Sequence, residues 1–292
     1  MRKVWFQVNR RSFIKRSLWS ILTVIGAGSG GYYYARNIEP SLLQIKKETI
    51  ASSKIPSSFD GFKIIQFSDT HIGFHYTIEQ LKDLVHQINM QDPDMVVFTG
   101  DLIDAPNQYH QYADVHSALL KINANYGKYW IYGNHDHGGY GTEIIKELMQ
   151  QSQFTLLQNN HAIIEKNVDR IIIAGIDDVI LGNPDLNKTL YQTNSDLFTI
   201  LLAHEPDFAE TTRLYPVNIQ LSGHSHGGQV RFPFLGHLYT PAYAEKYVQG
   251  KYTFDNENEF TLYVNSGIGT TRLPYRFLCN PEFHVYTLKH TV

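Results

Sequence analysis

Five short apolar segments in this chain each end in residues whose side chains can bind metals, and this repeated pattern constrains the fold more than any other feature. Short segments rich in β-branched and aromatic residues are typical of buried strands. In open α/β sheets, ligands bind where the carboxyl ends of the strands meet. The pattern therefore predicts an α/β fold that gathers polar side chains at one edge of its sheets. The segments and the residues that follow them are 62–67 before Asp69 and His71, 95–98 before Asp101, 128–132 before Asn134 and His135, 198–202 before His204, and 217–221 before His224 and His226.

The donor atoms in this set indicate divalent cations. Carboxylates, one amide oxygen and several imidazoles, without a thiolate, suit manganese, iron or zinc, and the order of affinities alone does not choose among them. The chain has a single cysteine, Cys279, so it can form neither an intramolecular disulfide nor a multi-cysteine zinc site. The sequence therefore predicts a metal-dependent hydrolase.

The remaining helix and strand signals favour one domain. Thr77 with Gln80 three residues later forms a capping box that predicts a helix, and Asp92 followed by Pro93 ends it. Strand, helix and strand across 62–98 make a βαβ unit, which favours parallel pairing. No internal repeat or linker divides the body, so we expect two facing mixed sheets flanked by helices, a four-layer α-β-β-α sandwich over 39–292. Further helices are expected at 112–123 and after Thr142, and further strands at 170–174, 229–232, 247–253 and 260–264.

The first 38 residues differ in character from this body. Asn9-Arg10-Arg11-Ser12-Phe13-Ile14-Lys15 resembles a twin-arginine export signal, and an uncharged stretch over 17–35 follows it. A plain amino-terminal membrane anchor with a basic flank is the competing interpretation. In either case we expect a protein at the outer face of the cell membrane or in the cell wall. If the segment is an export signal, the twin-arginine export machinery is an expected partner of the protein.

Charge argues against nucleic acid as a partner. The first sixteen residues hold six of the 25 basic residues and no acidic one, which leaves 19 basic residues against 28 acidic ones in the remainder. An acidic body is a poor match for the phosphate backbone of a nucleic acid. A small phosphorylated substrate held by metal ions remains compatible with this charge.

The ordered motifs resemble those of the calcineurin-like metallophosphoesterases. The match runs from Asp69 to His226 through Asp-x-His, Gly-Asp-x-x-Asp, Gly-Asn-His-Asp, a lone His and Gly-His-x-His. Each motif is weak alone, but five in this order, each after a predicted strand, are specific. The resemblance implies two divalent ions and attack of a bridging hydroxide on phosphorus. It assigns Asp69, His71 and His226 to one ion, Asn134, His204 and His224 to the other, Asp101 to both, and catalytic roles to His135 and to Asp104, which would orient it.

The carboxyl-terminal motifs are similar to those of the exported bacterial YkuE-type subgroup. Residues 223–229 and 265–274 carry this similarity. It implies phosphodiester or pyrophosphate substrates on the extracytoplasmic side. Arg272 or Arg276 could meet a substrate phosphate, with a surface loop position as the competing interpretation.

Two alternative functions remain open. The first is a hydrolase of UDP-linked acyl-sugar pyrophosphates or other lipid-linked phosphates, with an acyl groove formed by Phe232, Phe234, Leu235 and Tyr239. Packing of those four residues in the core is the competing interpretation. The second is a non-catalytic anchored binding protein, which predicts missing metal ligands, and none is missing. We further expect Asp136 to form a turn, Asp177 and Asp178 to be exposed loop carboxylates, and His137 to lie either in the cleft wall or in solvent.

Overall fold

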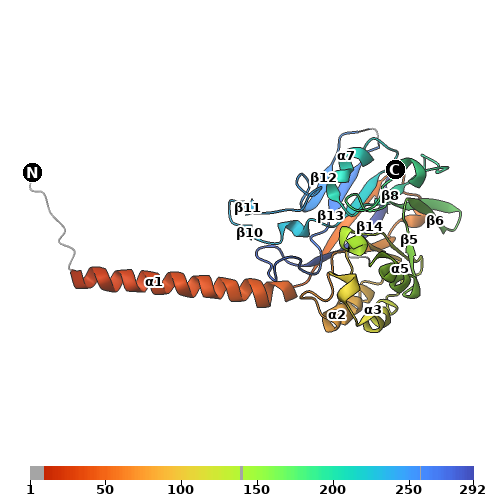
Figure 1. Ribbon diagram of the computed structural model, residues 1–292. Coiled ribbons are helices and arrows are strands. Elements are labelled where there is room, and N and C mark those ends of the chain that lie inside the picture. Colours follow the sequence, from red (N-terminus) through yellow and green to blue (C-terminus); the bar gives the residue numbers. More distant parts are fainter. Residues whose placement is uncertain (1–9, 139–140, 257) are drawn as a thin grey trace, which may run out of the picture.

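Two six-stranded mixed sheets face each other in the computed structural model, which describes residues 10–138, 141–256 and 258–292. Helices cover the outer side of the first sheet, and short helices and loops cover the outer side of the second (Figure 1). The predicted α/β sandwich of four layers is therefore confirmed. Its fourth layer is thin, because the two helices there, α6 (Leu186–Thr189) and α7 (Ala209–Thr212), have only four residues each.

The first sheet has the strand order β1-β14-β2-β3-β4-β5. Its strands β2 to β5 are parallel, as the βαβ pattern predicts. The chain's last strand, β14, enters between β1 and β2, parallel to the former and antiparallel to the latter. The strands are β1 (Gln44–Ser52), β2 (Lys63–Phe67), β3 (Met95–Phe98), β4 (Lys128–Trp130), β5 (Phe154–Leu156) and β14 (Glu282–His290), and the helices against them are α2 (Ile78–Asn89), α3 (Tyr112–Leu119) and α5 (Thr142–Gln151).

The second sheet has the strand order β12-β13-β9-β8-β7-β6, with the four inner strands parallel. A separate two-stranded hairpin, β10–β11, follows the turn after β9. The strands are β6 (Asn160–Lys166), β7 (Asp169–Gly175), β8 (Thr199–Leu202), β9 (Ile219–Ser222), β10 (Arg231–Phe232), β11 (Gly236–His237), β12 (Gly250–Thr253) and β13 (Thr261–Val264).

The core lies in three layers because successive strand residues face opposite sides of a sheet. In β2, Ile64 packs between the two sheets, whereas Ile65 packs against α2 and α3. The same alternation in β8 sends Ile200 to the central layer and Leu201 to the outer face of the second sheet. Both sheets are covered on both faces, so their strand ends are fixed with respect to each other.

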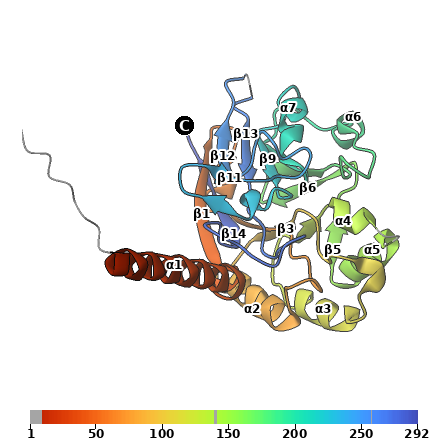
Figure 2. The ribbon, with the colours of Figure 1, turned by 60° about the vertical axis from the view of Figure 1, so that its left-hand side comes forward.

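The amino-terminal helix α1 (Arg10–Tyr33) extends away from this body (Figures 1 and 2). The first nine residues, which include Asn9 of the twin-arginine-like motif, lie outside the described residues. No helix in the described part of the chain is both long enough and apolar enough to cross a bilayer. The chain joins the body just after α1, where the Ala35 carbonyl accepts a hydrogen bond from the Arg276 N–H (2.9 Å) and the buried Glu39 carboxylate accepts one from the Cys279 N–H (2.5 Å).

Candidate metal centre

The loops after β2, β3, β4, β8 and β9 bring the predicted ligands together across the edge shared by the two sheets. Backbone bonds hold these loops to each other, since the Asp69 N–H donates to Gly100 (2.9 Å) and the His71 N–H to Asp101 (3.2 Å). A Cβ on Gly133 would lie 2.3 Å from Asp101 Oδ1, so that position has no room for a side chain. The close approach of the loops therefore depends on glycine there.

Backbone strain is concentrated at the predicted ligands. Five of them adopt the left-handed conformation, which side chains other than glycine rarely occupy. Strain of this kind persists where the surrounding structure holds it, and it gathers at functional sites. The residues are Asp69 (φ 53°), His71 (φ 42°), Asp101 (φ 63°), His224 (φ 67°) and His226 (φ 49°).

One group of donor atoms comes from Asp69, His71 and His226, all buried. Nε2 of His71 lies 3.1 Å from Nε2 of His226, and Asp69 Oδ1 lies 3.6 Å from the latter atom. Two imidazole nitrogens and a carboxylate oxygen thus converge on one point. Such a set suits a borderline divalent cation.

A second group comes from Asp101, His204 and His224, also buried. Nε2 of His204 lies 3.3 Å from Asp101 Oδ2 and 3.2 Å from His224 Nδ1. The same Asp101 oxygen is 3.5 Å from His71 Nε2 in the first group. Asp101 Oδ2 is therefore placed between the two groups.

Asn134 supplies an independent sign that this second group fits a cation. Its Oδ1 atom is buried and has no hydrogen-bond partner among the residues that the structure describes. A buried polar atom without a partner is unfavourable by about 1–3 kcal/mol. A metal ion would satisfy this oxygen, so the residues present fit the ions that the motifs imply.

Three imidazoles are oriented through their second ring nitrogen. His71 Nδ1 lies 3.0 Å from Asp104 Oδ1, His204 Nδ1 lies 2.6 Å from the Thr99 carbonyl, and His224 Nε2 lies 2.9 Å from the Ala242 carbonyl. An acceptor at this position places the proton there, which leaves the other nitrogen free to bind a metal. The three rings are thus held in the tautomer that a ligand needs.

The electrostatic balance of the centre also favours a cation. Burial lowers the pKa of His224 to about 3 and that of His226 well below its ordinary value, so both rings are neutral at pH 7 and able to act as ligands. Burial alone would lower the pKa of His204, but Asp101 and Asp69 raise it well above its ordinary value. The paired carboxylates therefore attract positive charge, which a divalent ion can supply.

His135 and Asp104 are brought together, in an arrangement that differs in detail from the sequence expectation. His135 Nδ1 bonds to the backbone carbonyl of Asp104 (2.8 Å), whereas the nearer carboxylate oxygen of Asp104 is 3.6 Å away. That carboxylate lies closer to His71. Asp104 thus contacts His135 chiefly through its main chain, and the His135 ring lines the cleft beside the ligands.

Asp136 is more than the turn residue that the sequence suggests. Its buried carboxylate accepts hydrogen bonds from the backbone N–H groups of Asp101 (2.8 Å), Leu102 (3.0 Å) and Gly133 (2.9 Å). Burial raises its pKa to about 6, with Asp101 adding to the effect. Asp136 therefore ties the β3 loop to the β4 loop, a role that no spacing rule identifies.

Several other sequence expectations are wrong in their burial. Asp177 and Asp178 are buried, 6% and 1% exposed, because Asp177 pairs with His137 (2.8 Å) and Asp178 accepts backbone N–H groups in its own loop. His137 is held by this pair and by its ring contact with Tyr132 (4.5 Å), with 13% of its side chain exposed. Arg276 is fully buried and donates to the carbonyls of Ser266, Gly267, Gly269 and Cys279, so it is neither a surface arginine nor a phosphate contact.

The expected core packing of Phe232, Phe234, Leu235 and Tyr239 is also wrong. Their exposed fractions run from 40% for Phe232 to 108% for Phe234. They belong to the β10–β11 hairpin and the segment after it, which lie outside both large sheets. Tyr239 lines the cleft that opens over the metal ligands.

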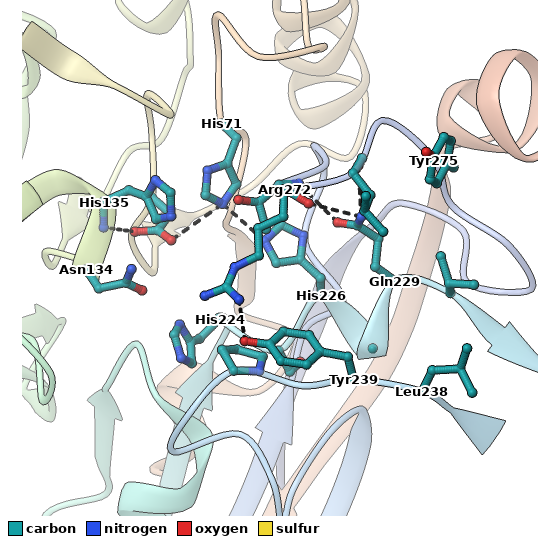
Figure 3. Close-up of a pocket in the computed structure, with 17 residues that line it drawn as sticks. His71, Asn134, His135, His224, His226, Gln229, Leu238, Tyr239, Arg272 and Tyr275 are labelled. Carbon is teal, nitrogen blue, oxygen red and sulfur yellow. Dashed lines mark hydrogen bonds and ion pairs between the residues drawn. The ribbon is translucent and has the colours of Figure 1, made fainter. Parts of the chain in front are cut away.

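That cleft has a volume of about 410 Å³ and two unlike walls (Figure 3). We call the first the metal wall; it consists of the seven predicted ligands, of which His71, Asp101, Asn134, His224 and His226 line the cleft and the buried Asp69 and His204 complete the set. The second, the outer wall, consists of Leu238, Tyr239, Pro241, Leu273 and Tyr275. Arg272 lies between the walls, where its guanidinium stacks on the Tyr239 ring (5.0 Å) and donates a hydrogen bond to the Tyr239 hydroxyl.

Comparison with known proteins agrees with this geometry. The sequence pattern of the calcineurin-like phosphoesterases matches residues 62–228. The chain is 47% identical over 286 residues to the uncharacterized metallophosphoesterase YkuE of Bacillus subtilis, a match that covers 98% of this chain and 99% of that one. It is 28% identical to the phosphodiesterase YaeI of Escherichia coli, over 94% of this chain and 97% of that one. It is 25% identical to the UDP-2,3-diacylglucosamine pyrophosphatase LpxG of Chlamydia trachomatis, over 90% and 94% respectively.

Proposed function

This chain belongs to the calcineurin-like phosphoesterase family and hydrolyses phosphoric esters, and from that premise we propose that it cleaves phosphodiester or pyrophosphate bonds with the help of two divalent ions. The observation that carries the proposal is the position of Asp101 Oδ2, which lies within 3.5 Å of donor atoms from both ligand groups. The buried Asn134 oxygen, which has no partner in the described part of the chain, supports Asn134 as a further ligand of the second group. Asp69, His71 and His226 would hold one ion, Asn134, His204 and His224 the other, and Asp101 both.

Two ions in such a centre supply Lewis-acid stabilisation of the phosphoryl oxygens and an acidified water as nucleophile. The chain's own contribution is to hold the ligands rigidly. The bonds from Asp104, Thr99 and Ala242 fix three of the imidazoles, and the Asp136 carboxylate fixes the loops that carry Asp101 and Asn134. Manganese, iron and zinc all suit these donors.

His135 is placed to act on the substrate itself. Its Nδ1 atom is engaged by the Asp104 carbonyl, its ring is packed edge-on against His71, and it lines the cleft. The remaining ring nitrogen is available to hold a phosphoryl oxygen or to donate a proton to the leaving oxygen. Proton transfer by a positioned side chain contributes about 10²–10⁴-fold to a rate.

Arg272 supports a substrate with a second charged group. Its side chain enters the cleft between the two walls and is held there by Tyr239. Guanidinium groups recognise phosphate through paired N–H donors. A phosphate that is not cleaved, as in a pyrophosphate, would meet Arg272 while the reacting phosphate lies on the metal wall.

A second candidate is a lipid-linked phosphate or UDP-acyl-sugar pyrophosphate, and the apolar outer wall favours it. Leu238, Tyr239, Leu273 and Tyr275 offer apolar surface beside the metal wall. The pyrophosphatase LpxG, one of the relatives, is named for a diacylated substrate. The chain retains the complete ligand set, which argues against a non-catalytic binding protein.

We further propose that the protein works outside the cytoplasm, at the outer face of the membrane or in the wall. The twin-arginine-like motif and the acid-free basic start support this location, with the export machinery as a partner. Because that route carries folded proteins, the ions would be acquired before export. Fractionation of cells that produce the full chain tests the location, and recovery of the protein in the cytoplasm alone would contradict it.

The reaction is tested with a chain stripped of metal and reloaded with manganese. Hydrolysis of a bis-aryl phosphodiester should appear on reloading and should fall by at least about 10³-fold in the Asp101→Asn variant. Asp196→Asn, which changes an exposed carboxylate before β8, is the matched control and should keep the parent rate. An Asp101→Asn variant as active as the parent would refute the assignment. Cleavage of a lipid-linked pyrophosphate but of no soluble one would select the second candidate.

A further inference from the structure

Three segments that are separate in the sequence form one apolar surface at the mouth of the cleft. The end of α1 meets the 271–278 loop through Tyr32 and Tyr275 (ring centroids 5.7 Å apart), and Tyr34, which follows α1, meets Phe277 (6.4 Å). Phe277 in turn lies 5.9 Å from Phe232 of β10. We call the exposed apolar residues of this surface the apolar rim: Tyr32, Tyr33, Phe232, Phe234, Leu235, Leu238, Tyr239, Tyr243, Leu273 and Leu278.

Packing within the chain does not explain why the tip of the β10–β11 hairpin carries apolar residues. Phe234 is 108% exposed and Leu235 is 77% exposed, so neither residue is packed within the described part of the chain. Phe234 also has a left-handed backbone (φ 67°), a conformation that disfavours a bulky side chain by about 1–2 kcal/mol. Glycine or asparagine would suit this turn better in water. A phenylalanine at this position indicates that the hairpin tip contacts something other than water.

The charged residues of the segments that form the apolar rim indicate that this contact is an anionic bilayer surface. The described residues 10–38, 229–243 and 271–278 contain eight of the chain's 25 lysines and arginines, of which Arg276 is fully buried, and none of its 28 acidic residues. Apolar and aromatic side chains interspersed with basic ones, without acids, match the interface of a bilayer that contains anionic lipid. The rest of the body carries every acidic residue and would be repelled by the same surface.

The positions of α1 and the β10–β11 hairpin are also compatible with contact to one bilayer surface. The hairpin tip and α1 leave the body on the same side in both views (Figures 1 and 2). Exposed apolar and basic residues continue along α1, among them Phe13, Leu18, Lys15 and Arg16. A flat surface could therefore contact the helix and the hairpin together.

We propose that the apolar rim docks on an anionic bilayer surface, with Phe234 and Leu235 inserted among the lipid headgroups and the mouth of the cleft held at the interface. The docking does not depend on the substrate assigned above, since it concerns only this surface. It gives an amphiphilic substrate a direct route from the bilayer to the metal wall.

The first test measures binding of the full, metal-loaded chain to vesicles of phosphatidylcholine with and without phosphatidylglycerol. The parent should bind the anionic vesicles more tightly, and salt should weaken that binding. The double variant Phe234→Ser, Leu235→Ser should bind at least about tenfold more weakly, because two apolar side chains no longer leave water. Val168→Ser is the matched control: Val168 is 93% exposed in the turn between β6 and β7, and β6 lies on the side of the body opposite the hairpin (Figure 1). Unchanged thermal unfolding in all variants excludes misfolding.

A second test reads insertion of the tip independently of α1. In Phe234→Trp, brominated lipid in the anionic vesicles should quench emission that the parent lacks, and Val168→Trp should show no added quenching. Equal vesicle binding by the parent and the double serine variant, or no added quenching in Phe234→Trp, would overturn the proposal. So would a parent that ignores vesicles but forms dimers that the double variant abolishes, since the apolar rim would then join two copies of the chain.

Discussion

The metal wall and the outer wall line the same cleft, but they are held in different ways. The ligands of the metal wall follow the central strands of both large sheets, and hydrogen bonds from a surrounding layer of residues orient them. The outer wall comes from the chain after the β10–β11 hairpin and from the 271–278 loop, which belong to neither sheet. Its residues Leu238 and Tyr239 are 65% and 54% exposed.

This difference separates chemistry from recognition. Reacting groups must be held within fractions of an ångström, which strand ends and buried carboxylates provide. A wall that selects among substrates can rest on a hairpin, because apolar contact tolerates movement. Changes to the metal wall should therefore remove metal or rate, whereas changes to the outer wall should alter which substrate binds.

The largest effect is expected from Asp136→Ala, which breaks the support of the metal wall. Three backbone N–H groups would lose their acceptor, so the free energy of unfolding should fall by about 3–5 kcal/mol. Less metal should also bind, because the loops of Asp101 and Asn134 are released. Chemical denaturation and elemental analysis measure both effects. Asp83→Ala, on the exposed face of α2, should change neither, and an Asp136→Ala chain with full stability would show that the metal wall needs no such support.

His135→Asn should separate rate from metal binding within the metal wall. The turnover number should fall by about 10²–10⁴-fold while both ions remain, because in the proposed role the ring, which lines the cleft, would contact substrate and not metal. Stopped assays with elemental analysis of the same samples check this. The exposed His110→Asn serves as control. Loss of one ion along with the activity would instead place His135 among the ligands.

Arg272→Met should act on recognition. The Michaelis constant for a soluble nucleotide pyrophosphate should rise by about 10–100-fold, since a hydrogen bond to a charged group is worth about 1.5–3 kcal/mol. Turnover of a bis-aryl diester, which lacks a second phosphate, should change much less. Arg272→Lys should restore part of the affinity. Equal losses on both substrates would mean that Arg272 serves the metal wall and not selection.

The smallest effect is expected at Asp177, a buried carboxylate outside the metal wall. Burial would raise its pKa, but hydrogen bonds from His137, the Asn183 N–H and Gln158 outweigh burial and lower the pKa to about 2. Burial would lower the pKa of His137, but the bond to Asp177 raises it above the ordinary 6.5. The contribution of Asp177 to the free energy of unfolding is complete above pH 3.8 and is lost as the pH falls toward 2. The His137 contribution is complete below pH 6.5 and is lost as pH rises through its elevated pKa.

The charged pair is therefore strongest between about pH 4 and pH 6.5. Asp177→Asn should reduce the free energy of unfolding by about 1–2 kcal/mol at pH 5.5 and by less at pH 9, because His137 loses its proton as the pH rises through its raised pKa. Denaturation at the two pH values checks this. A loss that is larger at pH 9 would contradict the assigned pair.

The sequence predicts the metal wall better than the outer wall, for a physical reason. Apolar strands that end in Asp, Asn or His follow local rules, so the five segments and the βαβ unit could be identified before the structure was known. The supports could not, because Thr99 and Ala242 act through backbone carbonyls that any residue type provides. The buried Arg276 depends on loop carbonyls that only the folded chain brings together.

The sequence does not predict the outer wall and the apolar rim, because the position of their apolar residues depends on the rest of the fold. Hydrophobicity marks Phe232, Phe234 and Leu235 as candidates for burial, but whether an apolar residue lies inside or outside depends on the sheet that receives it, and the hairpin joins neither sheet. The sequence also does not predict strand β14. Its partners β1 and β2 lie near the other end of the chain, so no local pattern indicates the pairing.

The most direct test of the shared role of Asp101 is electron paramagnetic resonance of the manganese-loaded chain, with the metal counted in the same sample. The parent should bind two ions per chain and show the spectrum of an exchange-coupled pair, and Asp101→Ala should lose the coupling. A parent with one ion, or with two uncoupled ions, would contradict a centre built around one shared carboxylate.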